Sequence, residues 1–137
     1  MATNKYKATK VRSGELTFDS LGEYRYWQKL NLLKSATSDR DRVLTIDRQV
    51  SYRLEVGGQL ITTYRADFVV TYADGRTEVQ DFKNPYLLGK GKSTPAGQLF
   101  TIKRKLMAAL HGLDIVTVTC LLLLCLTGCA PKNYPIF

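Results

Sequence analysis

Histidine and cysteine, on which many metal sites depend, are scarce in this sequence of 137 residues. The only histidine is His111, which excludes metal sites built from several histidines and most histidine-dependent nuclease mechanisms. The three cysteines all lie near the C-terminal end, at Cys120, Cys125 and Cys129. Their odd number and unpaired spacing argue against a disulfide framework and against a zinc site. The N-terminus has no apolar run, so we expect no signal peptide to begin there.

Acidic residues are also few, since twelve Asp and Glu stand against twenty Lys and Arg, for a net charge of +8. No acid occurs in residues 1–13 or in residues 84–113. A small domain this basic predicts a polyanionic partner, with nucleic acid first and a membrane surface second. The alternative is that this net charge serves only to keep the protein soluble. The charge therefore narrows the partner class without assigning a reaction.

The hydrophobic content of 45% is enough for a core, and the length is normal for one domain. Hydrophobic periodicity predicts a mixed α/β (α+β) fold with the order helix, three strands, helix, strand. The expected ranges are a basic arm at 1–13, a helix at 19–35, strands at 43–55, 60–72 and 76–83, a helix at 95–111 and a strand at 115–119. Helical spacing predicts a first-helix stripe of Tyr26, Trp27, Leu30 and Leu33. It predicts that the second helix buries Leu99, Ile102, Leu106 and Leu110.

The most informative stretch is residues 64–83, where two β-branched and aromatic runs flank an Asp-Gly turn signal. Each run carries a carboxylate among apolar residues, Asp67 in the first and Asp81 in the second. A two-residue loop would pair Asp67 with Phe82 and send Asp81 to the far face. A three-residue loop over residues 73–75, ending in a glycine at positive φ, would pair Asp67 with Asp81 directly. We expect an odd loop count or a bulge near residues 73–75, so that Asp67 and Asp81 share a face.

Two neighbouring carboxylates repel each other unless a cation lies between them. A divalent metal held by these hard oxygen ligands would remove that cost. Lys83 is two residues from Asp81, so the two side chains point to the same face of a strand. Edge charges that block aggregation are the alternative explanation for the two acids, and Lys83 alone could be an ordinary solvated lysine.

Three segments in this order resemble the PD-(D/E)XK nuclease superfamily. They are Glu23 in the run Phe-Asp-Ser-Leu-Gly-Glu, Asp67 in Ala-Asp-Phe, and Asp81 with Lys83 in Asp-Phe-Lys. More narrowly, they look like a group of small phage-associated proteins placed in that superfamily. The chain departs from the family pattern in two places: Ala66 stands where proline is common, and the second acid is Asp rather than the commoner Glu.

The resemblance implies a restriction-endonuclease-like αβββαβ core with a central mixed sheet flanked by helices. It implies one domain over residues 1–119, followed by an apolar tail at 120–137 whose role is open. The implied function is a Mg²⁺- or Mn²⁺-dependent DNA endonuclease, phage-encoded and acting in the cytoplasm of a bacterial host. In that scheme Asp67 and Asp81 bind the metal, and the carbonyl of Phe82 is a further ligand.

Two more site residues follow from the same resemblance. Glu23 would bind a second metal or a water at the first, and Lys83 would orient the attacking water and offset charge on the phosphate. Glu23 has a competing explanation, because Ser20-x-x-Glu23 is also a helix capping box. Both explanations stay open at this point.

Basic residues that flank the expected site predict how DNA is held. They are Lys90, Lys92, Lys103, Arg104 and Lys105. Lysine and arginine typically contact the phosphate backbone. We therefore predict that the protein recognises DNA shape, such as a Holliday junction or another branch, rather than base sequence. A junction cutter needs two sites and hence a homodimer. The alternatives are a non-catalytic nucleic-acid-binding module on the same fold and an accessory protein held at a membrane by residues 120–137.

Overall fold

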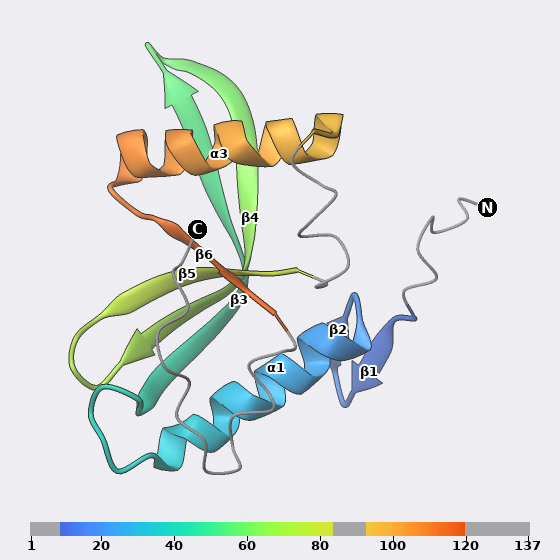
Figure 1. The fold of residues 1–137 in the computed structure, drawn as a ribbon, viewed down its shortest axis with the longest axis vertical. Helices are drawn as coiled ribbons and strands as arrows, with labels where there is room; N and C mark the ends of the chain where they lie inside the picture. The colour runs from blue at the N-terminus through green and yellow to red at the C-terminus, as the bar shows by residue number, and fades with distance from the viewer. Residues whose placement is uncertain (1–8, 84–92, 120–137) are drawn as a thin grey trace.

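The computed structural model describes residues 9–83 and 93–119 of the chain (Figure 1). The order helix, three strands, helix, strand is confirmed, with a short hairpin added in front. The elements are β1 (Val11–Ser13), β2 (Leu16–Phe18), α1 (Leu21–Leu32), the 3₁₀ helix η1 (Leu33–Ser35), β3 (Val43–Val56), β4 (Gln59–Tyr72), β5 (Thr77–Phe82), α3 (Pro95–His111) and β6 (Ile115–Val118).

The main sheet has four strands in the order β3-β4-β5-β6. The β3–β4 and β4–β5 pairs are antiparallel, whereas β6 pairs parallel to β5 through a crossover that contains α3. The sheet is therefore mixed, as expected. Figure 1 places α1 and α3 at opposite ends of the sheet.

Two clusters of buried residues form the core, one beside each helix. The first packs Tyr26 and Leu30 of α1 against Phe68 and Val70 of β4. The second packs Met107 of α3 against the other half of β4 and the start of β6. The stripe expected on the first helix is confirmed, because Trp27 and Leu33 pack against the first cluster as partly buried residues.

The turn between β4 and β5 has the three-residue loop that the sequence predicts. The N–H of Tyr72 donates to the carbonyl of Arg76 at 2.9 Å, which leaves residues 73–75 as the loop. Gly75 adopts φ +88°, a conformation that residues with a Cβ rarely take. The ladder pairs Phe68 with Gln80, so the next step in the same register places Asp67 opposite Asp81.

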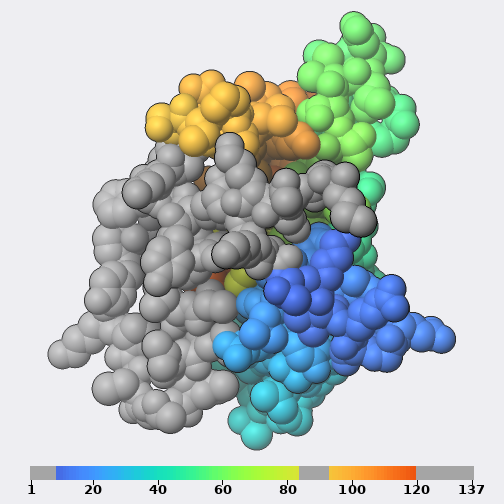
Figure 2. Space-filling view, turned by 90° about the vertical axis from the view of Figure 1, so that its right-hand side faces the viewer, coloured from blue at the N-terminus to red at the C-terminus, as the bar shows by residue number. Residues whose placement is uncertain are grey.

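β4 is much longer than β5, so part of β4 has no partner in β5. The β4–β5 ladder runs only from Phe68↔Gln80 to Thr71↔Thr77, whereas β3 and β4 stay paired over their whole length. Between the β3–β4 turn and Phe68, the β3–β4 hairpin is no longer paired with β5 and passes beside α3. Figure 2 shows its tip standing clear of that helix.

Residues 11–13 of the expected basic arm form β1, which pairs with β2 around a turn at Gly14, and residues 1–8 lie outside the described part. The expectation for the buried face of the second helix was wrong. On α3, Leu99, Ile102 and Leu110 are 48%, 51% and 41% exposed, whereas Met107 is fully buried. The helix contacts the sheet through Phe100, Leu106 and Met107, so its buried face is rotated by about one position from the prediction.

Candidate functional site

The candidate site lies where β4 separates from β5. Asp67 sits one residue past the end of the β4–β5 ladder, and its Oδ2 accepts the backbone N–H of Phe82 at 2.8 Å. A side-chain carboxylate thus occupies the position where the ladder would otherwise supply a backbone carbonyl. This bond fixes Asp67 beside the end of β5, which carries Asp81 and Phe82.

Asp81 is 5% exposed, and its two oxygens have different surroundings. Oδ1 accepts a long hydrogen bond of 3.5 Å from the hydroxyl of Tyr64. Oδ2 forms an ion pair with Nζ of Lys83 at 2.7 Å but has no well-angled hydrogen bond from the residues described. Burial, followed by the charge of Asp81, raises the pKa of the Tyr64 hydroxyl, so Tyr64 stays a neutral donor.

Lys83 is held from two sides. Its backbone N–H donates to the carbonyl of Val118 in β6 at 2.9 Å. Its ammonium lies 4.6 Å from the ring centre of Phe100 in α3, as a cation–π contact. The crossover from β5 to β6 therefore places a cation against the buried carboxylate of Asp81.

The electrostatics show that this site has too little positive charge. Burial and then the neighbouring charge of Asp81 raise the pKa of Asp67 from 3.8 to about 6. The N–H of Phe82 and the ammonium of Lys83 act in the opposite direction, while Glu23 adds to the rise. Because one lysine does not balance the buried Asp81 and the partly buried Asp67, an additional cation would stabilise their ionised forms.

Glu23, 4% exposed in the first turn of α1, has a clear structural role. Its N–H donates to Oγ of Ser20 at 3.1 Å, and its Oε2 accepts the N–H of Asp19 at 3.1 Å. The return bond reaches Asp19 rather than the cap residue, but both halves of a capping arrangement are present. Its Oε1 lacks a hydrogen-bond partner in the described residues, and burial raises its pKa.

Arg48 is a site neighbour that the sequence analysis missed. Its guanidinium lies 3.6 Å from Oε1 of Glu23, donates to the carbonyl of Thr17 at 2.8 Å and stacks on the ring of Phe18 at 3.9 Å. An arginine that shares a strand face with Ile46 and Val50 was the available signal, because period-2 spacing points it toward a half-buried surface. Arg48 partly neutralises Glu23 and ties β3 to the start of α1.

The metal ligands expected from the sequence come together only in part. In residues 9–83 and 93–119, no group of three or more His, Cys, Asp and Glu side chains could hold a metal ion. The structure offers a pair, Asp67 and Asp81, with the charge of Glu23 near enough to influence Asp67. Phe82 is brought to the pair by its backbone.

The expected DNA-contacting residues divide into two groups. Lys90 and Lys92 lie outside the described residues. Arg104 and Lys105 are exposed on α3, and Lys103 is partly exposed. Lys103 is one turn from Phe100, which touches Lys83, so it lies on the side of the helix that faces the site.

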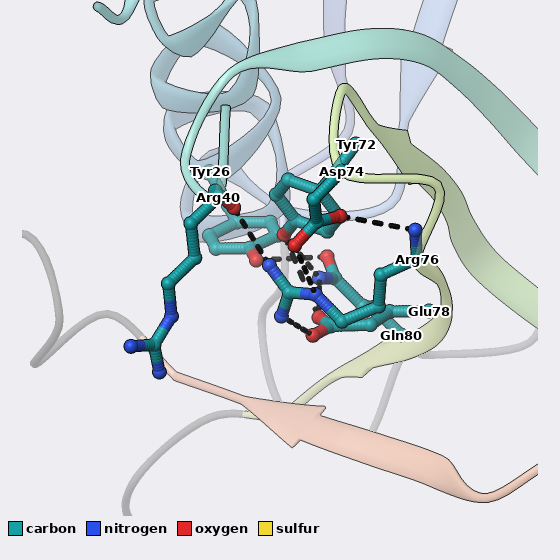
Figure 3. Close-up of polar contacts among 7 residues, drawn as sticks. All are labelled: Tyr26, Arg40, Tyr72, Asp74, Arg76, Glu78 and Gln80. Carbon is teal, nitrogen blue, oxygen red and sulfur yellow. Dashed lines mark hydrogen bonds and ion pairs between the residues drawn. The ribbon is translucent and has the colours of Figure 1, made fainter. Parts of the chain in front are cut away.

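A buried polar network surrounds the side chain of Gln80 (Figure 3). Since side chains alternate along a strand, Asp81 points to the other face of β5. The side-chain amide of Gln80, 2% exposed, accepts from the Tyr26 hydroxyl at 2.8 Å and donates to Glu78 at 2.8 Å and Tyr72 at 3.3 Å. Arg76 pairs with Glu78 and continues the network to the surface. Because these contacts join α1, β4 and β5, they fix the strand that positions Asp81.

Comparison with known proteins gives one match. The model of the family described as "Protein of unknown function (DUF1064)" matches residues 3–114. Neither the curated proteins nor the solved structures contain a match to this chain. In the described residues, no helix is long and apolar enough to cross a membrane; the tail at 120–137 lies outside them.

Proposed function

Because the chain belongs to this family, whose description assigns no activity, we propose a function from the site itself: divalent-metal-dependent hydrolysis of phosphodiester bonds in DNA. The proposal includes membership of the PD-(D/E)XK nuclease superfamily. It is supported by the resemblance of three short motifs and by an element order of helix, three strands, helix, strand.

One observation carries the proposal. The hairpin register sets Asp67 opposite Asp81 at the end of the β4–β5 ladder, with the ammonium of Lys83 2.7 Å from Asp81. Burial and the charge of Asp81 both disfavour the ionised form of Asp67, and its raised pKa expresses that cost. A bound Mg²⁺ or Mn²⁺ ion turns such an arrangement into a Lewis-acid centre for phosphoryl chemistry.

The residues have separate roles in this proposal. Asp67 and Asp81 hold the cation, with the carbonyl of Phe82 as a further ligand. Lys83 orients the attacking water and offsets the charge that develops on the phosphate. Glu23, which already serves as a helix cap and contacts Arg48, contributes through its Oε1 to a second metal or a water.

The substrate we propose is branched DNA, such as a junction or flap, in phage recombination or replication. The net charge of +8 and the exposed cations of α3 suit backbone contacts, which hold DNA without reading its bases. Cutting a four-way junction requires two strands to be cleaved, so the acting form in this proposal is a homodimer.

The test is cleavage of supercoiled plasmid and of a synthetic four-way junction with Mg²⁺ or with EDTA. We expect Mg²⁺-dependent cleavage that favours the junction, and we expect Lys83→Ala to abolish it. Arg25→Ala removes an exposed cation from the outer face of α1 and is the matched control. Equal cleavage by Lys83→Ala and Arg25→Ala would refute the assignment of Lys83.

A non-catalytic nucleic-acid-binding module is the second candidate. The observation in its favour is that Glu23 is engaged in capping and that the described residues offer a pair of acids rather than a trio. In that case wild-type protein binds junctions, does not cut them with any divalent metal, and gains affinity when Asp81→Asn removes a negative charge. The nuclease proposal predicts cutting by wild type and none by Asp81→Asn.

A further inference from the structure

A groove leads away from the candidate site along the surface between α1 and β3. From the helical side it is lined by Trp27, Asn31 and Lys34, and from the strand by Arg48 and Gln49. The three helical residues are spaced four and three apart, so they lie on one face. The groove therefore presents an aromatic ring, two amides and two cations, together with Leu16, Ile46 and the acid Asp47.

Two residues that line the groove connect it to the acids of the candidate site. Arg48 contacts Glu23, whose charge influences Asp67. Gln49 lies between Arg48, which pairs with Phe68, and Val50, which pairs with Ala66, so it stands opposite Asp67 across the β3–β4 ladder. Residues that line the groove are therefore neighbours of Glu23 and of Asp67.

The backbone at Gln49 is unusual. Its φ of +55° is the only positive value at a non-glycine residue in the described part of the chain. Residues with a Cβ rarely adopt this conformation, and such strain concentrates at binding and catalytic sites. Here it falls at the point where the groove meets the site, which supports a binding role for this surface.

Trp27 is positioned as a stacking platform. Its ring packs at 5.4 Å against Phe18 and at 6.1 Å against Tyr24, with an interplanar angle of 21° to the tyrosine. Its backbone carbonyl accepts from the amide of Asn31 at 2.9 Å, which orders the adjacent turn. A ring supported in this way and open to a groove can take a nucleobase at little entropic cost.

We propose that this groove binds a single-stranded DNA segment continuous with the scissile phosphate. One base stacks on Trp27, and the backbone runs past Arg48 and Lys34. The proposal rests on the proposed nuclease function and adds a substrate class to it, DNA with unpaired nucleotides beside the cut. Base faces are free to stack only when unpaired. Asp47 also lines the groove and repels phosphate, so the backbone follows the Lys34 side.

Trp27 is the only tryptophan in the chain, so its fluorescence reports on this groove alone. We expect an oligothymidylate to quench that fluorescence in EDTA, and a blunt duplex of equal length to quench it much less. With a labelled oligothymidylate, Trp27→Leu weakens binding about fivefold or more, the low end of what one stacked base contributes.

Lys34→Glu changes an exposed residue and leaves the packing of Trp27 intact. It should weaken oligothymidylate binding about threefold or more at low salt. Arg25→Glu reverses an equal charge two residues from Trp27, on the opposite side of α1, and should have a smaller effect.

These measurements separate the groove from the nuclease activity. Binding that quenches Trp27 fluorescence without any Mg²⁺-dependent cleavage would refute the proposed nuclease function and support the proposed groove. If the protein cleaves junctions but oligothymidylate leaves its Trp27 fluorescence unchanged, the groove proposal is refuted and the nuclease proposal stands. Equal weakening by Lys34→Glu and Arg25→Glu would also overturn it.

Discussion

The carboxylate of Asp67 accepts the backbone N–H of Phe82 at 2.8 Å and so replaces the next rung of the β4–β5 ladder. The acid is therefore part of the sheet's hydrogen bonding as well as a candidate ligand. An amide side chain can make the same bond through its oxygen while carrying no charge. This relationship makes the charge of Asp67 separable from its structural role.

Asp67→Asn should abolish Mg²⁺-dependent cleavage and stabilise the protein. At pH 7 the raised pKa implies a cost for the ionised acid of roughly 1–3 kcal/mol, which the amide removes. Chemical denaturation at pH 7 without divalent metal measures the change. Asp67→Ala, which loses the bond to Phe82 as well, is the matched comparison. Lower stability in Asp67→Asn would contradict the charge argument.

The pH dependence of stability should carry the signature of Asp67. Its pKa is higher in the folded state, about 6, than the ordinary 3.8. The folded protein therefore binds more protons between these values, and this group's contribution to stability falls as pH rises from about 4 to 6. The difference in unfolding free energy between wild type and Asp67→Asn should widen over that window and be flat above about pH 7.

Divalent metal should reverse this effect. In the proposed site a cation stabilises the two ionised acids, so Mn²⁺ should raise the melting temperature of wild type more at pH 7.5 than at pH 5. Asp81→Asn should lose most of that rise, and Arg25→Ala should keep it. Calorimetry that detects no Mn²⁺ binding to wild type at pH 7.5 would count against the metal site.

Glu23→Gln tests which role of the glutamate dominates. The amide can still accept the N–H of Asp19, but it lacks the negative charge that suits a helix N-terminus and that pairs with Arg48. Because burial disfavours the charge of Glu23 while the helix N-terminus and Arg48 favour it, these effects partly cancel, and we expect stability to change by less than about 1 kcal/mol. Cleavage near the wild-type rate would leave Glu23 as a helix cap, whereas an inactive variant of wild-type stability would make it a ligand.

Charge reversal on α3 should weaken DNA binding without changing the preference of the protein for any base sequence. Lys103→Glu with Lys105→Glu removes two cations from the helix that contacts Lys83 through Phe100. Affinity should fall about equally on every sequence, and the log–log salt slope should shrink by roughly 0.9 for each phosphate that the variant no longer neutralises. Weakening on one sequence alone would indicate base reading by this helix.

Local chemistry made the hairpin predictable from sequence. Asp74-Gly75 between two apolar runs fixed the turn, and the turn fixed the register of Asp67 and Asp81. The capping residue of α1 was visible for the same reason, because Ser20 accepts the N–H of Glu23, only three residues away. Short-range bonds of this kind depend on adjacent residues alone.

Long-range packing was not visible in the same way. The buried face of α3 depends on where the β3–β4 hairpin passes it, and helical spacing fits Leu99 and Ile102 as well as Phe100 and Met107. Arg48 and its contact with Glu23 join β3 to α1, segments that no local pattern connects. The pairing partners of such groups are a property of the assembled sheet.

The parallel pairing of β5 with β6 sets when the site can form. The α1 helix and the β3–β4–β5 hairpins close over short stretches of chain, whereas Lys83 must wait for the carbonyl of Val118 and the ring of Phe100. Contacts that span a crossover are the slow ones in folding. During synthesis the N-terminal sheet can therefore assemble first, and the cation that faces Asp81 is fixed in place only after α3 and β6 have left the ribosome.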